Sequence, residues 1–279
     1  MGGPLKNGVI YGIKICYFNI IPTLFPFFIL SDLWSSVVYF PKKSLIVGCF
    51  ERLFHINSEG FSVFILGNLC GFPLGAKMAS EKYKASLIDK REMESLSVTS
   101  SNPSAAFVVS GIGLGLFGSI KIGLILYISV LISAVIVGII YRPKAFIFKE
   151  PRNIVRQKFN LIESVKSAGS SSIVVASYII FFSSIIGVVK ALTQSRLAIS
   201  LISSFLEVGS ACTIIFENGD AIGSLCLPLI AFSLGFSGLS VFMQAFSILP
   251  KSVSKRMYLF KKLLQGILSA LLTLILLSI

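Results

Sequence analysis

Charged residues are scarce in this sequence. Only 13% of its 279 residues are Asp, Glu, Lys or Arg, whereas soluble domains carry about 25%. Four long stretches contain no charge at all, at residues 122–140, 167–189, 221–250 and 263–279. Each is near or above the roughly 17–20 residues that cross the hydrocarbon core of a bilayer. A water-soluble fold cannot bury so many helices that are apolar on every side, so the sequence predicts several membrane spans.

The usual groupings of catalytic and metal-binding residues are also missing. The sequence has one histidine, His55, and its five cysteines include no CxxC pair. We find no Ser-His-Asp set and no pair of carboxylates at a spacing that suggests acid–base chemistry. We therefore expect a protein that is not an enzyme and that has no metal site and no cofactor.

Basic residues outnumber acidic ones by 25 to 12, which gives a formal net charge of +13. Most of them lie between the apolar stretches, notably in 142–158 and 251–262. This distribution is typical of cytoplasmic loops, whose positive charge sets the orientation of a membrane protein. We therefore expect lipid around the chain and no nucleic-acid partner.

Two of the apolar segments in the first half are interrupted. Four glycines and Pro73 break one of them and favour a re-entrant helical hairpin. Asn102-Pro103 interrupts helical hydrogen bonding in the other. We expect, in order, an interfacial amphipathic helix, a first span, the hairpin, a broken span and a plain span, at residues 4–19, 22–40, 60–76, 95–120 and 122–140.

The second half repeats this order. Glu207 and Gly209 interrupt a second candidate hairpin, and Gly235–Ser240 interrupts the long apolar stretch that follows. The successive segments are a span, the hairpin, a broken span and a plain span, at 172–189, 197–216, 221–250 and 263–279.

If the first span runs inward and the hairpins do not cross, the second half starts on the opposite side from the first. The sequence thus predicts an all-α, polytopic membrane protein, an inverted repeat of about six crossings with two re-entrant hairpins and two broken helices. Its parts would be a first repeat, a basic cytoplasmic linker and an inverted second repeat, at 1–141, 142–160 and 161–279.

Polar residues inside these segments are the candidates for function, because they are costly in lipid and face one another or a cavity. Broken helices also expose N–H and C=O groups that can bind ions or solutes. The predicted substrate-binding residues are Ser101, Asn102, Ser104, Gly238, Ser240 and Gln244. A coupling or hairpin role is assigned to Asn68, Lys77, Glu207 and Asp32. The alternative is that small residues at the breaks only let helices pack closely, and that Lys77 extends to the surface.

Five segments together resemble the sporulation integral membrane protein YlbJ family. In chain order they are Asn19–Leu33, Gly71–Lys77, Ser101–Pro103 with the glycine-rich run to Gly118, Phe205–Val208, and Phe236–Gln244. The sequence departs from the family at Phe260–Leu263, where members have a histidine, and we expect no membrane span before Pro4.

The resemblance implies a fold and a function. The family is grouped with nucleoside-recognition, or Gate, domains, which are similar to concentrative nucleoside transporters. It implies a transporter in a spore-forming bacterium that moves dipicolinate, a small aromatic dianion, from the mother cell across the outer forespore membrane. The alternatives are a scaffold of a sporulation complex that transports nothing, or a transporter of a nucleoside-like solute. A homo-oligomer is compatible with each.

The distribution of basic residues predicts the topology. Twenty of the 25 lie in loops expected inside, and only Lys6, Lys14, Lys121, Lys190 and Arg196 lie outside. In a cysteine-free background, a membrane-impermeant maleimide added to intact cells should label Lys121→Cys and miss Arg152→Cys. Labelling of both positions, or of Arg152→Cys alone, would contradict the inverted repeat.

Overall fold

The structure is a computed structural model that describes residues 2–37, 44–143 and 160–278. The described residues form helices joined by short turns and contain no strand. Four helical segments are long and apolar enough to cross a membrane, namely Ile120–Ile140, Leu161–Leu192, Gly219–Ile248 and Lys255–Leu277. The predicted all-α, polytopic membrane fold is confirmed. The linker 142–160 falls largely outside the described residues, and so do residues 38–40 of the predicted first span.

The helices of the first half follow the expected order. They are α1 (Gly2–Ile15), η1 (Cys16–Ile20), α2 (Ile21–Val37), α3 (Leu45–Phe54), α4 (Ser58–Cys70), α5 (Leu74–Lys84), α6 (Lys90–Thr99), η2 (Ala106–Leu114) and α7 (Ile120–Ile140). The predicted hairpin is α4 and α5, which pack against each other across the turn at Gly71–Pro73. The predicted broken span is α6 and η2, which separate at residues 100–105.

The second half has the same plan. It contains α8 (Leu161–Leu192), α9 (Arg196–Leu206), α10 (Val208–Glu217), α11 (Gly219–Ile222), η3 (Gly223–Leu225), α12 (Cys226–Phe236), α13 (Gly238–Ile248) and α14 (Lys255–Leu277). The second hairpin, α9 and α10, turns at Glu207, and the second broken helix separates α12 from α13 at Ser237. All four predicted interruptions are therefore present, whereas the side of the membrane from which each hairpin enters stays a prediction.

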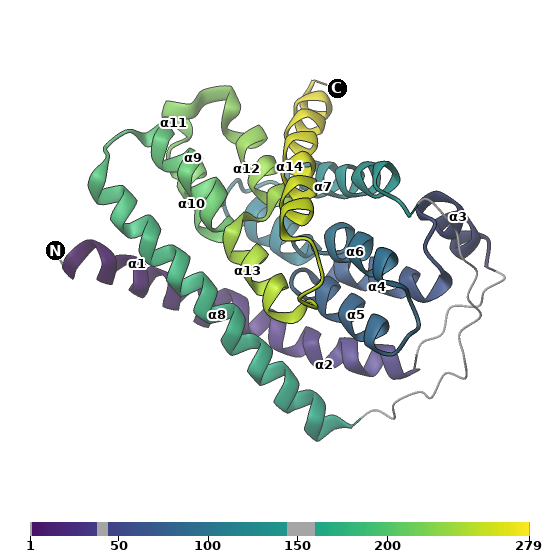
Figure 1. The fold of residues 1–279 in the computed structure, drawn as a ribbon. Coiled ribbons are helices and arrows are strands. Elements are labelled where there is room, and N and C mark those ends of the chain that lie inside the picture. The colour runs from purple at the N-terminus through teal and green to yellow at the C-terminus, as the bar shows by residue number, and fades with distance from the viewer. Residues whose placement is uncertain (1, 38–43, 144–159, 279) are drawn as a thin grey trace.

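Corresponding helices of the two halves pack against each other (Figure 1). The first helices, α1 and α2, run along α8, and the last helices, α7 and α14, contact each other near the centre of the molecule. In the second pair, the Ser133 and Ser269 hydroxyls lie 2.7 Å apart. This pairing of equivalent elements is what a repeat related by two-fold symmetry produces.

The packing of α1 along α8 corrects the placement expected for residues 4–19. A Cβ atom at Gly12 would lie 2.8 Å from the Ile180 Cα, and one at Gly187 would lie 2.5 Å from the Pro4 carbonyl oxygen. Glycines let helices approach this closely, which is how helices associate in lipid. Because Gly187 lies in the uncharged part of α8, the segment expected at the interface is packed beside a candidate membrane span.

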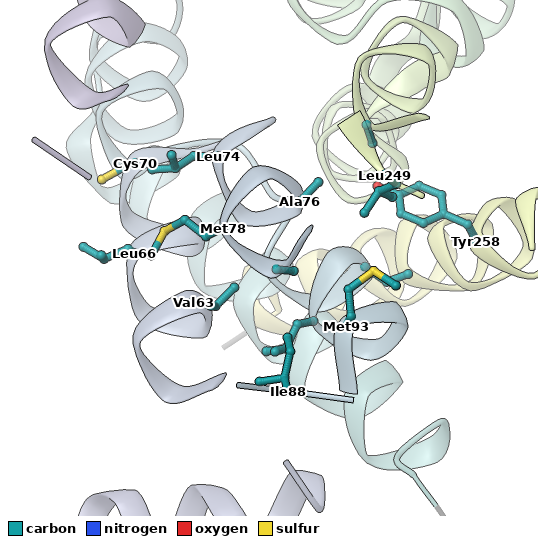
Figure 2. Close-up of a cluster of buried hydrophobic side chains, with 14 of the residues drawn as sticks. Val63, Leu66, Cys70, Leu74, Ala76, Met78, Ile88, Met93, Leu249 and Tyr258 are labelled. Atoms are coloured by element: carbon teal, nitrogen blue, oxygen red, sulfur yellow. The ribbon is translucent and has the colours of Figure 1, made fainter. Parts of the chain in front are cut away.

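Apolar clusters surround both hairpins. Figure 2 shows the first, in which α4 and α5 bury Val63, Leu66 and Met78 against Met93 of α6 and Tyr258 of α14. The second cluster packs α10 against α12, η2 and α7. Each hairpin is thus fixed at its sides by apolar packing, which leaves its turn to face the middle of the protein.

Candidate substrate site

The two hairpin turns and the two broken helices surround one cavity of about 580 Å³. The first half contributes Gly71 and Phe72 of its hairpin turn, and Pro103 and Ser104 of its broken helix, followed by residues of η2. The second half contributes Glu207–Gly209 and Thr213 of its hairpin, and Val241 and Gln244 of α13. Residues of α1, η1, α2 and α8 form the remaining wall of the cavity. The cavity therefore lies between the two hairpin turns, the first helix break and α13 of the second broken helix.

Each hairpin turn contacts the break of the broken helix in its own half. The Phe72 N–H donates to the Asn102 carbonyl oxygen at 2.9 Å. A Cβ atom at Gly71 would lie 2.8 Å from the Ser104 nitrogen, and one at Gly238 would lie 3.1 Å from the Leu206 carbonyl oxygen. Both glycines also have positive φ angles, +91° and +77°, which side chains disfavour. The same kind of contact between hairpin turn and helix break thus occurs in both halves.

The walls of the cavity are mainly apolar and include the rings of Phe18, Phe72 and Phe107. A few polar side chains, Ser104, Ser110, Thr213 and Gln244, also line it. The Gln244 amide nitrogen donates to the Ser240 hydroxyl at 3.2 Å, and the Gln244 amide oxygen is buried without a hydrogen-bond partner. An apolar pocket with a few placed polar groups is the usual form of a small-molecule site.

Among the described residues that line the cavity, Glu207 is the only one with a charged side chain. It is 2% exposed, and its carboxylate caps α10 by accepting from the Gly209 N–H at 2.9 Å and the Ser210 N–H at 2.6 Å. An N-terminal cap and the helix dipole both stabilise a negative charge at this position. Glu207 was assigned a coupling or a hairpin role, and the structure contains the hydrogen bonds within the hairpin.

Asn102 and Ser101 do not line the cavity, because the break directs them to the other side. The Asn102 amide nitrogen donates to the Asn68 side-chain oxygen at 2.7 Å, and the Asn102 side-chain oxygen accepts from the Gln265 amide nitrogen at 2.6 Å. The Lys262 ammonium lies 3.1 Å from the same Asn102 oxygen. Asn102 therefore joins the first hairpin to α14 in a fully buried polar network.

Lys262 and Gln265 were missed as network residues by the sequence analysis, which assigned Lys262 to a basic loop. That assignment is wrong, because Lys262 lies in α14 and is 2% exposed. A signal was present in the sequence. Polar residues recur at helical spacing along the last apolar segment, at Lys262, Gln265, Ser269 and Thr273, and all four are buried. A polar stripe on one side of an apolar helix indicates a buried polar contact.

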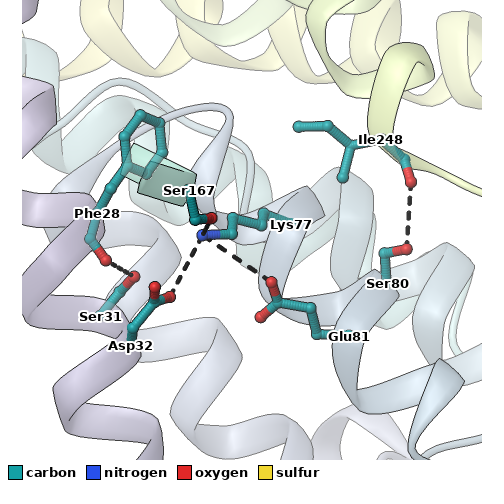
Figure 3. A network of polar contacts seen from close by, with 8 residues as sticks. All are labelled: Phe28, Ser31, Asp32, Lys77, Ser80, Glu81, Ser167 and Ile248. Carbon is teal, nitrogen blue, oxygen red and sulfur yellow. Dashed lines mark hydrogen bonds and ion pairs between the residues drawn. The ribbon is translucent and has the colours of Figure 1, made fainter. Parts of the chain in front are cut away.

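Lys77 and Asp32 also lie away from the cavity, where they form an ion pair at 3.2 Å (Figure 3). The Lys77 ammonium also donates to the Ser167 hydroxyl of α8 at 3.2 Å and lies 3.9 Å from Glu81. The pair thus ties α5 to α2 and α8. Asp32 lies within α2, and Ser167 is the residue at which the uncharged part of α8 begins.

Of the ten residues singled out from the sequence, Ser104, Gln244 and Glu207 line the cavity. Ser240 supports Gln244, Gly238 forms the close contact with the second hairpin, and the remaining five belong to the Asn102 network or the Lys77 ion pair. Within the described part of the chain, no group of three or more His, Cys, Asp or Glu residues could hold a metal ion.

The chain is similar to a known membrane protein. No protein-family model and no solved structure matches the chain. The chain is 24% identical to the sporulation integral membrane protein YlbJ of Bacillus subtilis (strain 168), over 95% of this chain and 76% of that protein. The resemblance to the YlbJ family is confirmed. The similarity to YlbJ also agrees with the all-helical fold of a polytopic membrane protein.

The Asn102 network predicts the effect of removing one amide. Asn102→Ala leaves the Asn68 oxygen, the Gln265 amide nitrogen and one Lys262 proton without that partner, and each buried unpaired group costs about 1–3 kcal/mol. We expect a clear fall in the unfolding midpoint of the purified protein in detergent. Asn7→Ala is the matched control, because Asn7 is exposed on α1. Equal midpoints for the two variants would contradict a structural role for the network.

Proposed function

We propose that the chain is a membrane transporter whose solute occupies the cavity between the two interrupted halves, and that this solute is dipicolinate, moved from the mother cell across the outer forespore membrane. The observation that supports transport is the position of the cavity. Each half contributes one hairpin turn and one broken helix to it, which is how inverted-repeat transporters build a solute site. Movement of one half against the other would open such a site to either side in turn.

The form of the cavity suits a small aromatic solute. Its volume, about 580 Å³, is within the range of roughly 300–1,000 Å³ usual for small-molecule sites. The Phe72 and Phe107 rings can pack against an aromatic ring, and the Ser104 and Ser110 hydroxyls can donate to carboxylate oxygens. The Gln244 amide oxygen can only accept a hydrogen bond. It therefore suits a protonated or other hydrogen-bond-donating group of the solute.

Glu207 supports a second candidate, a neutral nucleoside-like solute. None of the described residues that line the cavity is a lysine or arginine, so among them a dianion would meet one carboxylate and no compensating cation. A sugar hydroxyl, by contrast, could donate to Glu207 or to the Gln244 oxygen. In favour of dipicolinate, the Glu207 charge is directed at two backbone N–H groups of α10, which reduces its repulsion of an anion.

The scaffold hypothesis, unlike the two transporter hypotheses, does not require an open cavity. A scaffold works through its outer surface, so filling the cavity would leave it functional. A transporter loses its solute site when the same space is filled.

Filling the cavity is therefore the first test. A Cβ atom at Gly111 would have only the Phe107 ring within 4 Å, at 3.8 Å, and Gly111 lines the cavity. Gly111→Leu should insert and fold but lose most uptake of labelled dipicolinate into proteoliposomes that contain this protein alone. Gly169→Leu is the matched control, since a Cβ atom there has nothing within 4 Å and Gly169 does not line the cavity. Absence of uptake by the parent protein, or equal uptake by Gly111→Leu, would favour the scaffold.

The charge of Glu207 distinguishes the two solutes. Glu207→Gln removes one negative charge from the cavity and should strengthen dipicolinate binding by about 10-fold or more, because about 1.4 kcal/mol of relieved repulsion corresponds to 10-fold in affinity. A neutral nucleoside such as uridine should bind equally well or more weakly. Titration calorimetry of the folded variant and the parent with both solutes measures these affinities and distinguishes the two candidates. A loss of dipicolinate affinity would count against an anionic solute.

A further inference from the structure

Lys262 is a buried lysine that the proposed transport mechanism does not use. It is 2% exposed, and none of the ion pairs formed by described residues includes it. Its ammonium instead contacts three neutral oxygens, the Ser101 carbonyl at 2.8 Å, the Gln265 side chain at 3.0 Å and the Asn102 side chain at 3.1 Å. Burying a charge without a carboxylate partner is costly, so the presence of three neutral oxygens around this ammonium needs a physical reason.

The three oxygens are arranged as a protonated lysine requires. An ammonium has three N–H donors and no acceptor, and each of its donors has one oxygen. A neutral amine would direct its lone pair at one of these oxygens. The amide orientations agree, since the Asn102 and Gln265 nitrogens donate to other groups and their oxygens are left for Lys262.

The place of this cation in the fold is informative. α6 ends at Thr99, and Ser101 is in the break that follows, so the ammonium lies beyond the C-terminal end of a half-helix, where the helix dipole attracts positive charge. In broken-helix transporters, unwound carbonyls and half-helix C-terminal ends are where the coupling cation binds. Backbone and amide oxygens of the kind found here are typical ligands of such an ion.

We propose that the Lys262 ammonium fills a monovalent-cation site formed by oxygens of Ser101, Asn102 and Gln265, so that the chain itself supplies the cation that other broken-helix transporters take from solution at this position. The oxygens lie 2.8–3.1 Å from the nitrogen. That spacing suits ammonium or a large monovalent ion, whereas Mg²⁺ needs about 2.0–2.1 Å and Ca²⁺ about 2.3–2.6 Å. The first broken helix thus has a tethered cation at this position and no need of a free one.

The test is to remove the tethered cation and offer a free one. Lys262→Ala deletes the ammonium and leaves space beside the three oxygens. In choline chloride, its unfolding midpoint in detergent should fall by about 5 °C or more below that of the parent. Ammonium or propylammonium chloride should restore most of the loss in a saturable way, and choline, which is too large for the site, should not. The parent midpoint should be the same in all these salts.

Three variants make the result specific. Lys262→Met fills the same space without charge, so it should be destabilised and indifferent to ammonium. Lys261→Ala removes the neighbouring lysine, whose ammonium lies 5.2 Å from the centre of the Tyr141 ring, and should not respond to these salts. If Lys262→Ala yields no folded protein in any salt, Lys262→Gln takes its place: a lowered midpoint supports the need for a cation, and the parental midpoint contradicts it.

The proposal is also overturned if Lys262→Ala keeps the parental midpoint in choline, or if choline and ammonium stabilise it equally. The measurement involves no solute. It therefore tests the cation site independently of the proposed transport function, which depends on the uptake experiments.

Discussion

The structure depends on one constraint, that a helix interrupted inside an apolar environment must find partners for the backbone groups it frees. In lipid an unpaired N–H or C=O costs several kcal/mol. This chain interrupts helices at four places, and at three of them the freed backbone groups have partners as follows. The Glu207 carboxylate caps α10, the Phe72 N–H binds the Asn102 carbonyl, and Lys262 binds the Ser101 carbonyl. The irregular backbone is tolerated only because it is buried in protein and borders a cavity.

The partners of these backbone groups differ between the two halves. The contact between hairpin turn and helix break recurs in both, through Gly71 in one and Gly238 in the other. The charges do not recur. The first break has a buried cation, Lys262, and the second hairpin has a buried anion, Glu207. The protein therefore has two distinct buried polar environments, and of these two only that of Glu207 faces the cavity.

Much of the fold could be predicted from particular residues. Pro73, Asn102-Pro103, Glu207 and Gly235–Ser240 identified the four interruptions, because proline, glycine and a lone carboxylate in an apolar stretch each conflict with a continuous membrane helix. The candidate site was predicted less well. Ser104 and Gln244 line the cavity, but Asn102 faces away from it. A break is visible in the sequence, whereas the direction in which each of its side chains points depends on how the flanking helices pack.

The sequence by itself determined the membrane environment, the order of segments and the positions of the interruptions, because these follow from hydrophobicity and from backbone chemistry that acts over a few residues. Only the tertiary structure decided which interruptions meet, that α1 packs along α8, and that Lys262 is buried beside Asn102, 160 positions earlier in the chain. In the sequence, Lys262 follows another lysine and is near a basic loop, so its neighbours indicate a solvated residue. Its burial follows from the packing of α14 against α6 and α7, which brings oxygens from distant parts of the chain around one ammonium.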